Sequence, residues 1–198
     1  MRPILFVALC ISMLLSPADI AAKSKPRVVT IEALIDHQDN VLAAKTVINA
    51  AILDVSAVFR KEFNIEFRLV AVGQWRPPSN RFDGNEELIQ LEMAGHAKSD
   101  IVVAFTSQSF FADVPEEIDG EVTTVKRTSG GLAKSGGNHA IVRLYDRADM
   151  ILIHEIAHLF MAGHSTDSRS VMNGAAITGK TFDADSKEVI RANRDRTF

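Results

Sequence analysis

Apolar and polar positions follow two different periods in the first third of the chain. Residues 27–35 form a β-branched run typical of a strand, and residues 65–72 form a second one. Between them, residues 40–63 place apolar side chains at helical spacing, among them Ala44, Ile48, Ala51, Val55 and Val58. A strand, a helix and a strand in this order predict two parallel strands joined by a right-handed crossover.

The middle of the chain predicts shorter elements. Residues 86–93 fit a short helix, and residues 101–105 are a compact apolar run suited to a buried strand. Residues 130–133 and 140–144 indicate two further strands, whereas residues 106–126 have no regular period, so we expect a loop there. The pattern therefore predicts an α/β domain with a small sheet.

A third amphipathic segment predicts a helix that begins near residue 146. Asp146 can cap this helix, and Asp149 adds negative charge at the positive end of the helix dipole. The core-facing side chains are then Ile153, Ile156, Ala157, Phe160 and Met161.

Two histidines project from a neighbouring face of this helix, because His154 and His158 are four residues apart. Glu155 lies about 100° around the helix axis from His154, so it can contact a water on a metal ion instead of the ion itself. Gly163 can turn the chain and let His164 approach from outside the helix. Three neutral imidazoles leave the fourth position of a zinc ion open, as a catalytic zinc site requires.

A His-Glu-x-x-His pattern also occurs by coincidence, and its histidines are then solvated or bonded within a core. Here the third histidine, the helical pattern and the preceding sheet together favour zinc binding. The remaining histidines lack such a context, and we expect none of them to bind metal; they are His37, His96 and His139.

The first 22 residues have the pattern of a secretory signal peptide. Arg2 supplies the positive charge, residues 4–15 are apolar, and residues 18–22 offer small side chains for cleavage. The apolar run is shorter than the ~20 residues that span a bilayer, so we expect cleavage and export to the periplasm or the medium. Residues 23–198 would then form a single catalytic domain without a membrane span.

Composition and cysteine usage narrow the chemistry. The chain has 198 residues, of which 46% are hydrophobic and 24% charged, and this suits one packed domain. A net charge of −3 provides no basic surplus for nucleic acid. The single cysteine, Cys10, lies in the predicted signal peptide, so the mature domain has no disulfide and no thiolate ligand. Histidines and carboxylates must therefore supply the chemistry.

The sequence HEIAHLFMAGH at 154–164, followed by SVMN at 170–173, resembles the signature of the metzincin clan of zinc metallopeptidases. The resemblance implies an α/β fold of the metzincin-like zincin type. Such a fold has a mixed, mostly parallel twisted sheet, with four parallel strands and one antiparallel edge strand. Long helices, an active-site helix, a turn containing a methionine beneath the metal, and a last helix at residues 183–193 complete it.

Carried over to this chain, the resemblance implies that His154, His158 and His164 bind zinc and that Glu155 is the general base. Met172 becomes the methionine of the turn. Ser165, after the third histidine, is similar to the residue found in matrixins.

One position departs from the signature, because the family glycine is replaced by Met161. Either Met161 stays helical and Gly163 makes the turn, or Met161 adopts a left-handed conformation at a cost of ~1–2 kcal/mol. A gluzincin-like alternative replaces His164 by Glu188 as the third ligand. The spacing from His158 favours His164.

These residues predict an exported zinc endopeptidase, in which Glu155 takes a proton from a water on the zinc ion. A zinc hydrolase of a cell-wall or non-protein amide, or a silent zinc-binding module on the same fold, are the alternatives. If the family geometry holds, residues 131–133 (Gly131, Leu132 and Ala133) pair with an extended peptide, and Ile177 lines a roomy apolar pocket.

The expected partners follow from this function. We expect a monomer that acts on protein or peptide substrates and that a separate inhibitor protein could restrain. Calcium is not expected, because residues 83–87 contain too few acidic side chains for a calcium loop.

Overall fold

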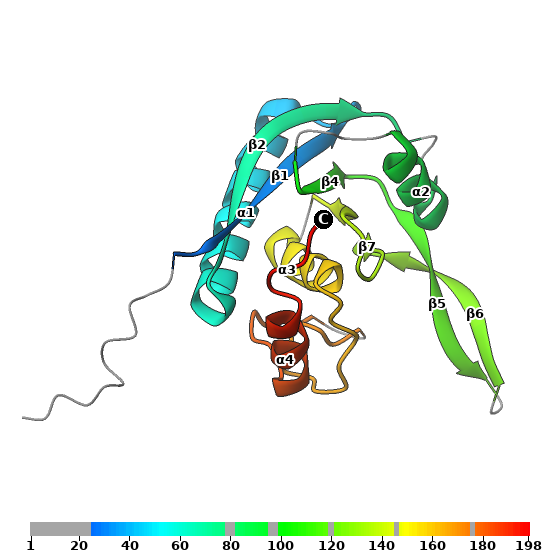
Figure 1. The fold of residues 1–198 in the computed structure, drawn as a ribbon. Coiled ribbons are helices and arrows are strands. Elements are labelled where there is room, and N and C mark those ends of the chain that lie inside the picture. The colour runs from blue at the N-terminus through cyan, green and yellow to red at the C-terminus, as the bar shows by residue number, and fades with distance from the viewer. Residues whose placement is uncertain (1–24, 78–81, 95–98, 119–120, 145–146, 175–176) are drawn as a thin grey trace, which may run out of the picture.

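The main sheet has five strands in the order β2-β1-β4-β8-β7. The computed structural model describes residues 25–198, except 78–81, 95–98, 119–120, 145–146 and 175–176. The first four strands are parallel, and β7 pairs antiparallel with β8 at one edge (Figure 1). This arrangement confirms the predicted sheet of four parallel strands and one antiparallel edge strand. The strands are β1 (Arg27–Asp36), β2 (Ile65–Trp75), β4 (Ile101–Thr106), β7 (Gly131–Ala133) and β8 (His139–Arg143).

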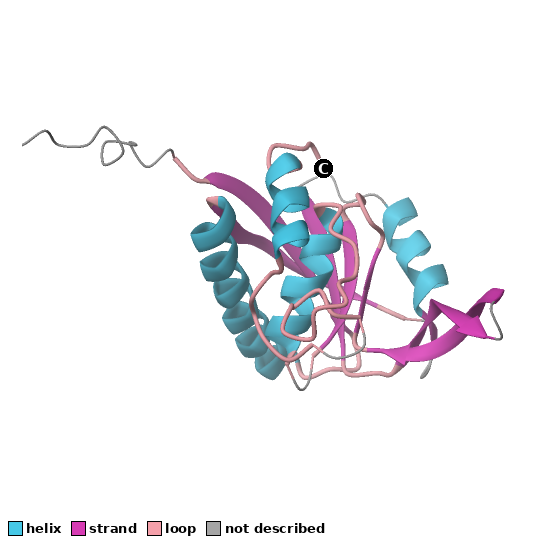
Figure 2. Cartoon of the chain, turned by 90° about the horizontal axis from the view of Figure 1, so that it is seen from below, coloured by secondary structure: helices cyan, strands magenta, loops and turns pink. Residues whose placement is uncertain are grey.

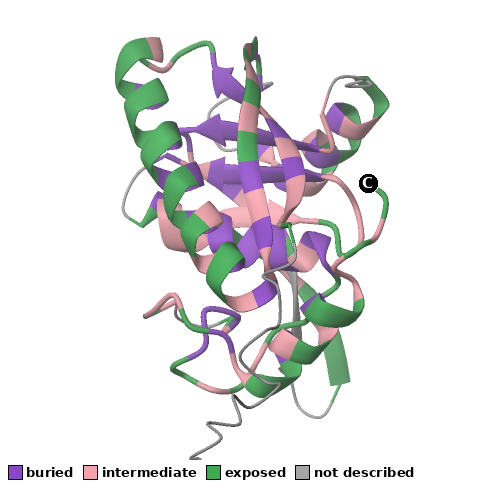
Figure 3. Ribbon diagram, turned by 60° about the vertical axis from the view of Figure 1, so that its left-hand side comes forward, coloured by how far each residue is buried: buried purple, intermediate pink, exposed green. Residues whose placement is uncertain are grey.

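Two helices cover one face of this sheet. The helices α1 (Val41–Phe63) and α3 (Ala148–Leu159) share one hydrophobic core with β1, β4 and β8. In Figure 3 the strands at the centre are buried, whereas the outer side of α1 is exposed. By length and composition α1 could cross a membrane, but core helices share these properties, and its buried stripe packs here on the sheet.

The opposite face of the sheet is covered by α2 (Gly84–Ala94), which packs in a second, smaller core. Figure 2 shows α2 well separated from α1. The last helix, α4 (Ala184–Ala192), begins after Asp183 and ends before Asn193, as predicted. Its N-cap residue, Asp183, accepts a hydrogen bond from the Ser186 N–H group.

The predicted loop at residues 106–126 is wrong. Strands β5 (Phe110–Ile118) and β6 (Glu121–Ser129) form an antiparallel hairpin that projects from the body of the domain (Figure 1). The short strand β3 (Phe82–Asp83) pairs with the base of β5. The sequence pattern failed because β6 is almost wholly exposed, and a strand with two solvated faces shows no alternation of apolar and polar residues.

The start of α3 also differs from the predicted cap. Asp146 lies outside the described residues, and the helix follows Arg147, which has φ 73° and makes no side-chain capping bond. The Arg147 guanidinium instead donates a hydrogen bond to the Ile177 carbonyl at 2.7 Å. Asp149 lies in the first turn of the helix, as predicted.

Candidate metal centre

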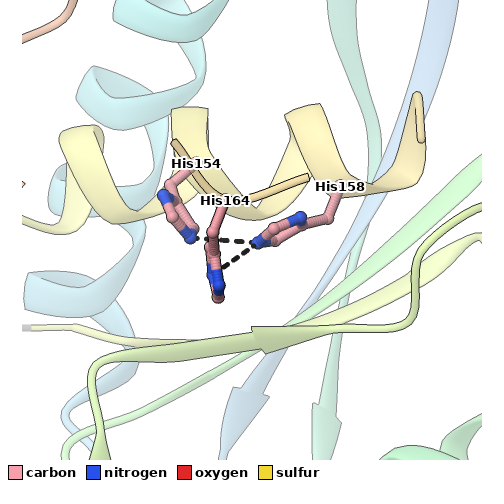
Figure 4. Close-up of side chains that lie close together, drawn as sticks. All are labelled: His154, His158 and His164. Atoms are coloured by element: carbon pink, nitrogen blue, oxygen red, sulfur yellow. Dashed lines mark hydrogen bonds between the residues drawn. The ribbon is translucent and has the colours of Figure 1, made fainter. Parts of the chain in front are cut away.

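Three imidazoles converge beside helix α3. His154 and His158 project from the same side of the helix, and His164 reaches them from the chain that follows it (Figure 4). The Nε2 atom of His158 lies 3.0 Å from Nε2 of His154 and 3.2 Å from Nε2 of His164. Among the described residues these three form the group that could hold a metal ion, with ligand atoms within 4.8 Å of one another.

Backbone carbonyls fix how two of these rings are protonated. The Nδ1 atom of His154 lies 2.7 Å from the Val171 carbonyl, and Nδ1 of His158 lies 2.7 Å from the Ala162 carbonyl. A carbonyl oxygen can only accept, so each Nδ1 atom carries the proton and each Nε2 atom presents a lone pair to the centre. Ligand histidines in metal sites are oriented in the same way.

Desolvation favours the neutral form of the three imidazoles, of which His154 is buried, His158 half-buried and His164 exposed. Desolvation, followed by the proximity of His158, lowers the pKa of His154 to about 3. Desolvation also lowers the pKa of His158 to about 4, and it lowers the pKa of His164. Neutral imidazole is the form that binds metal, so the site favours a cation over protons.

The spacing of these nitrogens fits zinc. Tetrahedral zinc with Zn–N bonds of ~2.0–2.1 Å places two ligand nitrogens ~3.3 Å apart. The observed separations of 3.0 and 3.2 Å are close to this value. A set of three imidazoles without thiolates is also a ligand set that catalytic zinc uses.

The chain reaches His164 through a left-handed residue at the end of α3. Met161 has φ 70°, its N–H donates to the His158 carbonyl, and the Ala162 N–H donates to the Ala157 carbonyl. These two bonds define a Schellman motif, in which the left-handed position is usually glycine. The second of the two predicted alternatives therefore holds, and the prediction that Gly163 makes the turn is wrong.

Glu155 is buried directly beneath the edge strand of the sheet. A methyl group added to Gly131 would overlap the Glu155 carboxylate and come within 2.6 Å of the Ile151 side chain. Strand β7 can pass this closely only because residue 131 lacks a side chain. Desolvation raises the pKa of Glu155 to about 8.

A family model places these observations among known proteins. Residues 26–188 match the model for metallo-peptidase family M12. The chain belongs to this family. It is therefore a zinc metallopeptidase, and it carries a three-histidine group suited to the metal.

Solved structures share the fold of this M12 chain at low sequence identity. Archaemetzincin from Methanopyrus kandleri is 17% identical over 89% of this chain and 100% of that chain, with a TM-score of 0.63. Archaemetzincin from Archaeoglobus fulgidus, complexed with malonate, is 15% identical over 82% of this chain and 99% of that chain, with a TM-score of 0.51. Metalloproteinase-II from Bacteroides fragilis is 14% identical over 85% of this chain and 53% of that chain, with a TM-score of 0.55. No curated protein matches the chain.

The turn that contains Met172 lies against two of the three histidines in this M12 chain. Met172 is fully buried, and its carbonyl accepts a hydrogen bond from the Ser165 N–H at 2.8 Å. The preceding residue, Val171, provides the carbonyl that orients His154. After the turn, a methyl group on Gly174 would approach the His164 ring to 3.1 Å.

Sequence reasoning did not find the polar support of this turn. The Ser170 hydroxyl donates to the Asp183 carboxylate at 2.6 Å and accepts from the Met172 N–H at 3.1 Å. Asp183 could have been found as the N-cap of the last helix from its place before the helical pattern. Nothing in the sequence pattern marks Ser170, because its partner is 13 residues away.

The other candidate ligands lie elsewhere in the described structure. Glu188 is exposed on α4 and does not belong to the three-histidine group, which favours His164 over the gluzincin-like alternative. His37 lies beside Asp36, and His139 lies beside Asn138, both outside that group. His96 is outside the described residues.

The predicted substrate residues face two different sides of the sheet. Ala133 packs against the core that contains α3, whereas Leu132 packs against the smaller core on the opposite face. Gly131 lies above Glu155. Ile177 packs against the larger core, and residues 175–176 are outside the described residues.

Proposed function

We propose that this chain is an exported zinc endopeptidase in which His154, His158 and His164 hold one catalytic zinc ion. The observation that supports these ligands most strongly is the convergence of three Nε2 atoms, two of them with Nδ1 protons committed to carbonyls. Glu155, buried beside this centre, is the proposed general base, and Met172 is the methionine of the supporting turn.

Glu155 is suited to move protons in peptide hydrolysis. Zinc, when bound, polarises a substrate carbonyl and acidifies a water molecule. The Glu155 carboxylate accepts a proton from the attacking water and later donates it to the leaving amine. Burial raises the pKa of the Glu155 carboxyl, which makes the ionised form a stronger base, and a zinc ion bound nearby would favour that ionised form.

Substrate binding is assigned to the open edge of β7. This strand pairs with β8 on one side only. Because the Arg143 N–H bonds the Gly130 carbonyl, Leu132 also faces β8, whereas Gly131 and Ala133 direct their backbone groups to the open side. An extended peptide can pair there with Ala133, and with Gly131 in place of the Ser129 hydroxyl that now donates to the Gly131 carbonyl. Gly131 would hold this peptide above Glu155. Ile177 is the proposed wall of the pocket for the neighbouring substrate side chain.

Export is supported by the sequence of residues 1–22, with its positive charge, apolar run and small residues. We further propose that residues 23–198 act as a monomer on protein or peptide substrates. The absence of cysteine from residues 23–198 is consistent with a domain whose stability comes from its core and its metal.

Zinc affinity tests the proposed ligand set. His164→Ala should weaken zinc binding at least ~100-fold, because it removes one of three ligands. Glu188→Ala is the matched control and should leave the affinity unchanged. Competition titrations with a zinc-sensitive dye measure both variants, and a larger loss in Glu188→Ala would refute the assignment.

Substitution of Glu155 tests the proposed base. Glu155→Gln keeps the shape of the side chain but cannot accept the proton, so kcat should fall by ~10²–10⁴ while one zinc ion stays bound. Glu188→Gln serves as the control with an exposed carboxylate. A variant at residue 155 that retains full kcat would exclude Glu155 as the base.

A further inference from the structure

Strands β6 and β7 form one continuous outer edge. Strand β6 pairs with β5 up to Ser129, which lies opposite Phe110. At the next residue the pairing passes to β8, because the Arg143 N–H donates to the Gly130 carbonyl at 2.9 Å. Among the described strands, none pairs with the other side of β6 or β7. From Glu121 to Ala133 this outer edge is therefore not covered by a described strand, and at its middle the Ser129 hydroxyl donates to the Gly131 carbonyl (Figure 1).

Both inner partners lie on the same side of this edge. Strand β5 continues from β4, and β8 lies between β4 and β7 in the main sheet. The hairpin, with β3, forms a separate three-stranded sheet that the chain joins to the main sheet between β4 and β5 and at Gly130, where β6 leads into β7.

The two edges of the hairpin differ in how well they resist pairing. The sequence of β5 contains Asp113, Pro115, Glu116 and Glu117, and charges and proline are the residues that protect an edge strand. Strand β6 has no proline, and its residues 122–125 form an uncharged β-branched run between Glu121 on one side and Lys126 and Arg127 on the other. Val122 is 77% exposed. An exposed edge of this composition favours the addition of another strand.

We propose that β6 binds an extended segment of a protein substrate, C-terminal to the bond that is cleaved. This inference rests on the proposed function, in which β7 pairs with the substrate. A substrate that pairs antiparallel with β7 runs in the opposite direction to β7. The substrate residues C-terminal to the cleaved bond therefore lie toward the N-terminal end of β7, where they meet β6. Antiparallel pairing is the more stable arrangement for short strands.

The length of β6 defines the substrate class. Its nine residues span about 30 Å at ~3.3 Å per residue. A short peptide ends before it reaches most of this edge, whereas an unfolded protein segment can pair along it. The hairpin therefore increases the affinity for long polypeptides. It does not change the rate of the hydrolysis step at Glu155.

Shortening the hairpin tests this inference. Residues 114–125 are replaced by Asn-Gly, which joins Asp113 to its paired partner Lys126 through a two-residue turn. The ion pair of Lys126 with Asp83 and the buried Phe110 and Ala112 at the base remain. A second variant, Val122→Lys with Thr123→Lys, places charges on the intact edge.

Three peptides share one cleavage sequence; two of them carry a ten-residue extension, one at the C-terminal end and one at the N-terminal end. In the wild type, the C-terminal extension should lower KM at least tenfold with kcat unchanged. Shortening should abolish this gain, the double lysine variant should reduce it at least threefold, and both should cleave the unextended peptide at the wild-type rate. A gain from the N-terminal extension alone, or one that persists after shortening, would overturn the inference.

Binding separates this inference from the proposed function. Fluorescence anisotropy of the same peptides on Glu155→Gln needs no turnover, and the C-terminally extended peptide should bind at least tenfold more tightly only when the hairpin is intact. Failure of the wild type to cleave any of the peptides would count against the peptidase proposal, while anisotropy still decides the role of β6. Self-association that depends on the hairpin, without peptide preference, would assign the edge to a second copy of the chain and overturn the inference.

Discussion

At the scale of single residues, the access of His164 to the metal centre depends on Met161. Its φ of 70° costs ~1–2 kcal/mol in a residue other than glycine. The two bonds of the Schellman motif and the burial of Ala157 and Ala162 hold this conformation in place. The strain is local to the turn that separates the second histidine from the third.

Met161→Gly should stabilise the domain by about 0.5–1 kcal/mol. Glycine removes the left-handed penalty, but part of the gain is lost because glycine makes the unfolded chain more flexible. Urea unfolding measures the difference. Ala162→Gly is the control and should be destabilising, because residue 162 does not have a positive φ. A destabilised Met161→Gly would contradict this view of the turn.

Gly131→Ala should lower kcat by ~10–100-fold and leave zinc affinity unchanged. The added methyl group must displace Glu155 or Ile151, and displacement of a catalytic group by about 1 Å costs up to ~100-fold in rate. Gly130→Ala is the matched control, since its methyl group meets only the flexible end of Ile151 at 3.0 Å. Steady-state kinetics give kcat for both variants, and the zinc content of each is measured alongside. Equal kcat values for Gly131→Ala and Gly130→Ala would show that β7 does not constrain Glu155.

The sequence predicted the site residues better than the path between them. Helical periodicity alone places His154 and His158 on one face, because the angle between residues four apart is fixed. The turn before His164 could not be predicted, because the left-handed residue is a methionine while a glycine lies two residues later. In the folded chain the C-cap bonds decide which residue turns.

At the scale of elements, α4 is tied to the turn beneath the metal centre. Asp183 caps α4, and its carboxylate also accepts a hydrogen bond from the Ser170 hydroxyl. Burial raises the pKa of the Asp183 carboxyl, but the hydrogen bonds from Ser170 and Ser186 outweigh it and hold that pKa well below its usual range. The ionised carboxylate therefore stabilises the fold.

Asp183→Asn should destabilise the domain by about 1–2 kcal/mol at pH 7. Because the folded pKa is lower than the unfolded pKa of ~3.9, the contribution of Asp183 is present above pH 4 and is lost as the pH falls below it. The difference from the wild type should thus narrow at pH 3. Urea unfolding at both pH values provides the measurement, with Asp185→Asn in the first turn of α4 as the control. A difference that stays constant with pH would exclude the ionised form as the source.

Elements with a buried side were predicted well, and the exposed element was not. The strand, helix and strand of residues 27–75 follow from apolar stripes that pack in the larger core. At the base of the β5–β6 hairpin Phe110 and Ala112 are buried, whereas β6 is almost wholly exposed. The two strands are paired over nine positions, and sequence periodicity does not report backbone pairing.

At the scale of the whole molecule, zinc would join three separate parts of the chain. His154 and His158 belong to α3, His164 to the chain after it, and the orienting carbonyl of Val171 to the buried turn. A ligand that binds only the folded state at 1,000 times its Kd stabilises it by ~4 kcal/mol. The metal should therefore act on global stability as well as on activity.

Saturation with zinc should raise Tm by about 10 °C over the chelated protein, because 1 kcal/mol corresponds to ~2–4 °C in a domain of this size. Scanning calorimetry with and without a chelator measures the shift. In His158→Ala the shift should largely disappear, whereas in a variant of the exposed His37 it should persist. Equal shifts in both variants would place the stabilising metal elsewhere.

The central claim is that a zinc ion at the three histidines makes this chain a peptidase. The most direct test incubates a mixed peptide library with three samples: the zinc-loaded protein, the chelated protein, and the chelated protein to which zinc has been returned. Mass spectrometry then identifies the new peptide termini. We predict cleavage at internal peptide bonds, loss of cleavage on chelation and recovery with one equivalent of zinc. An intact library with one zinc ion bound at these histidines would contradict the account.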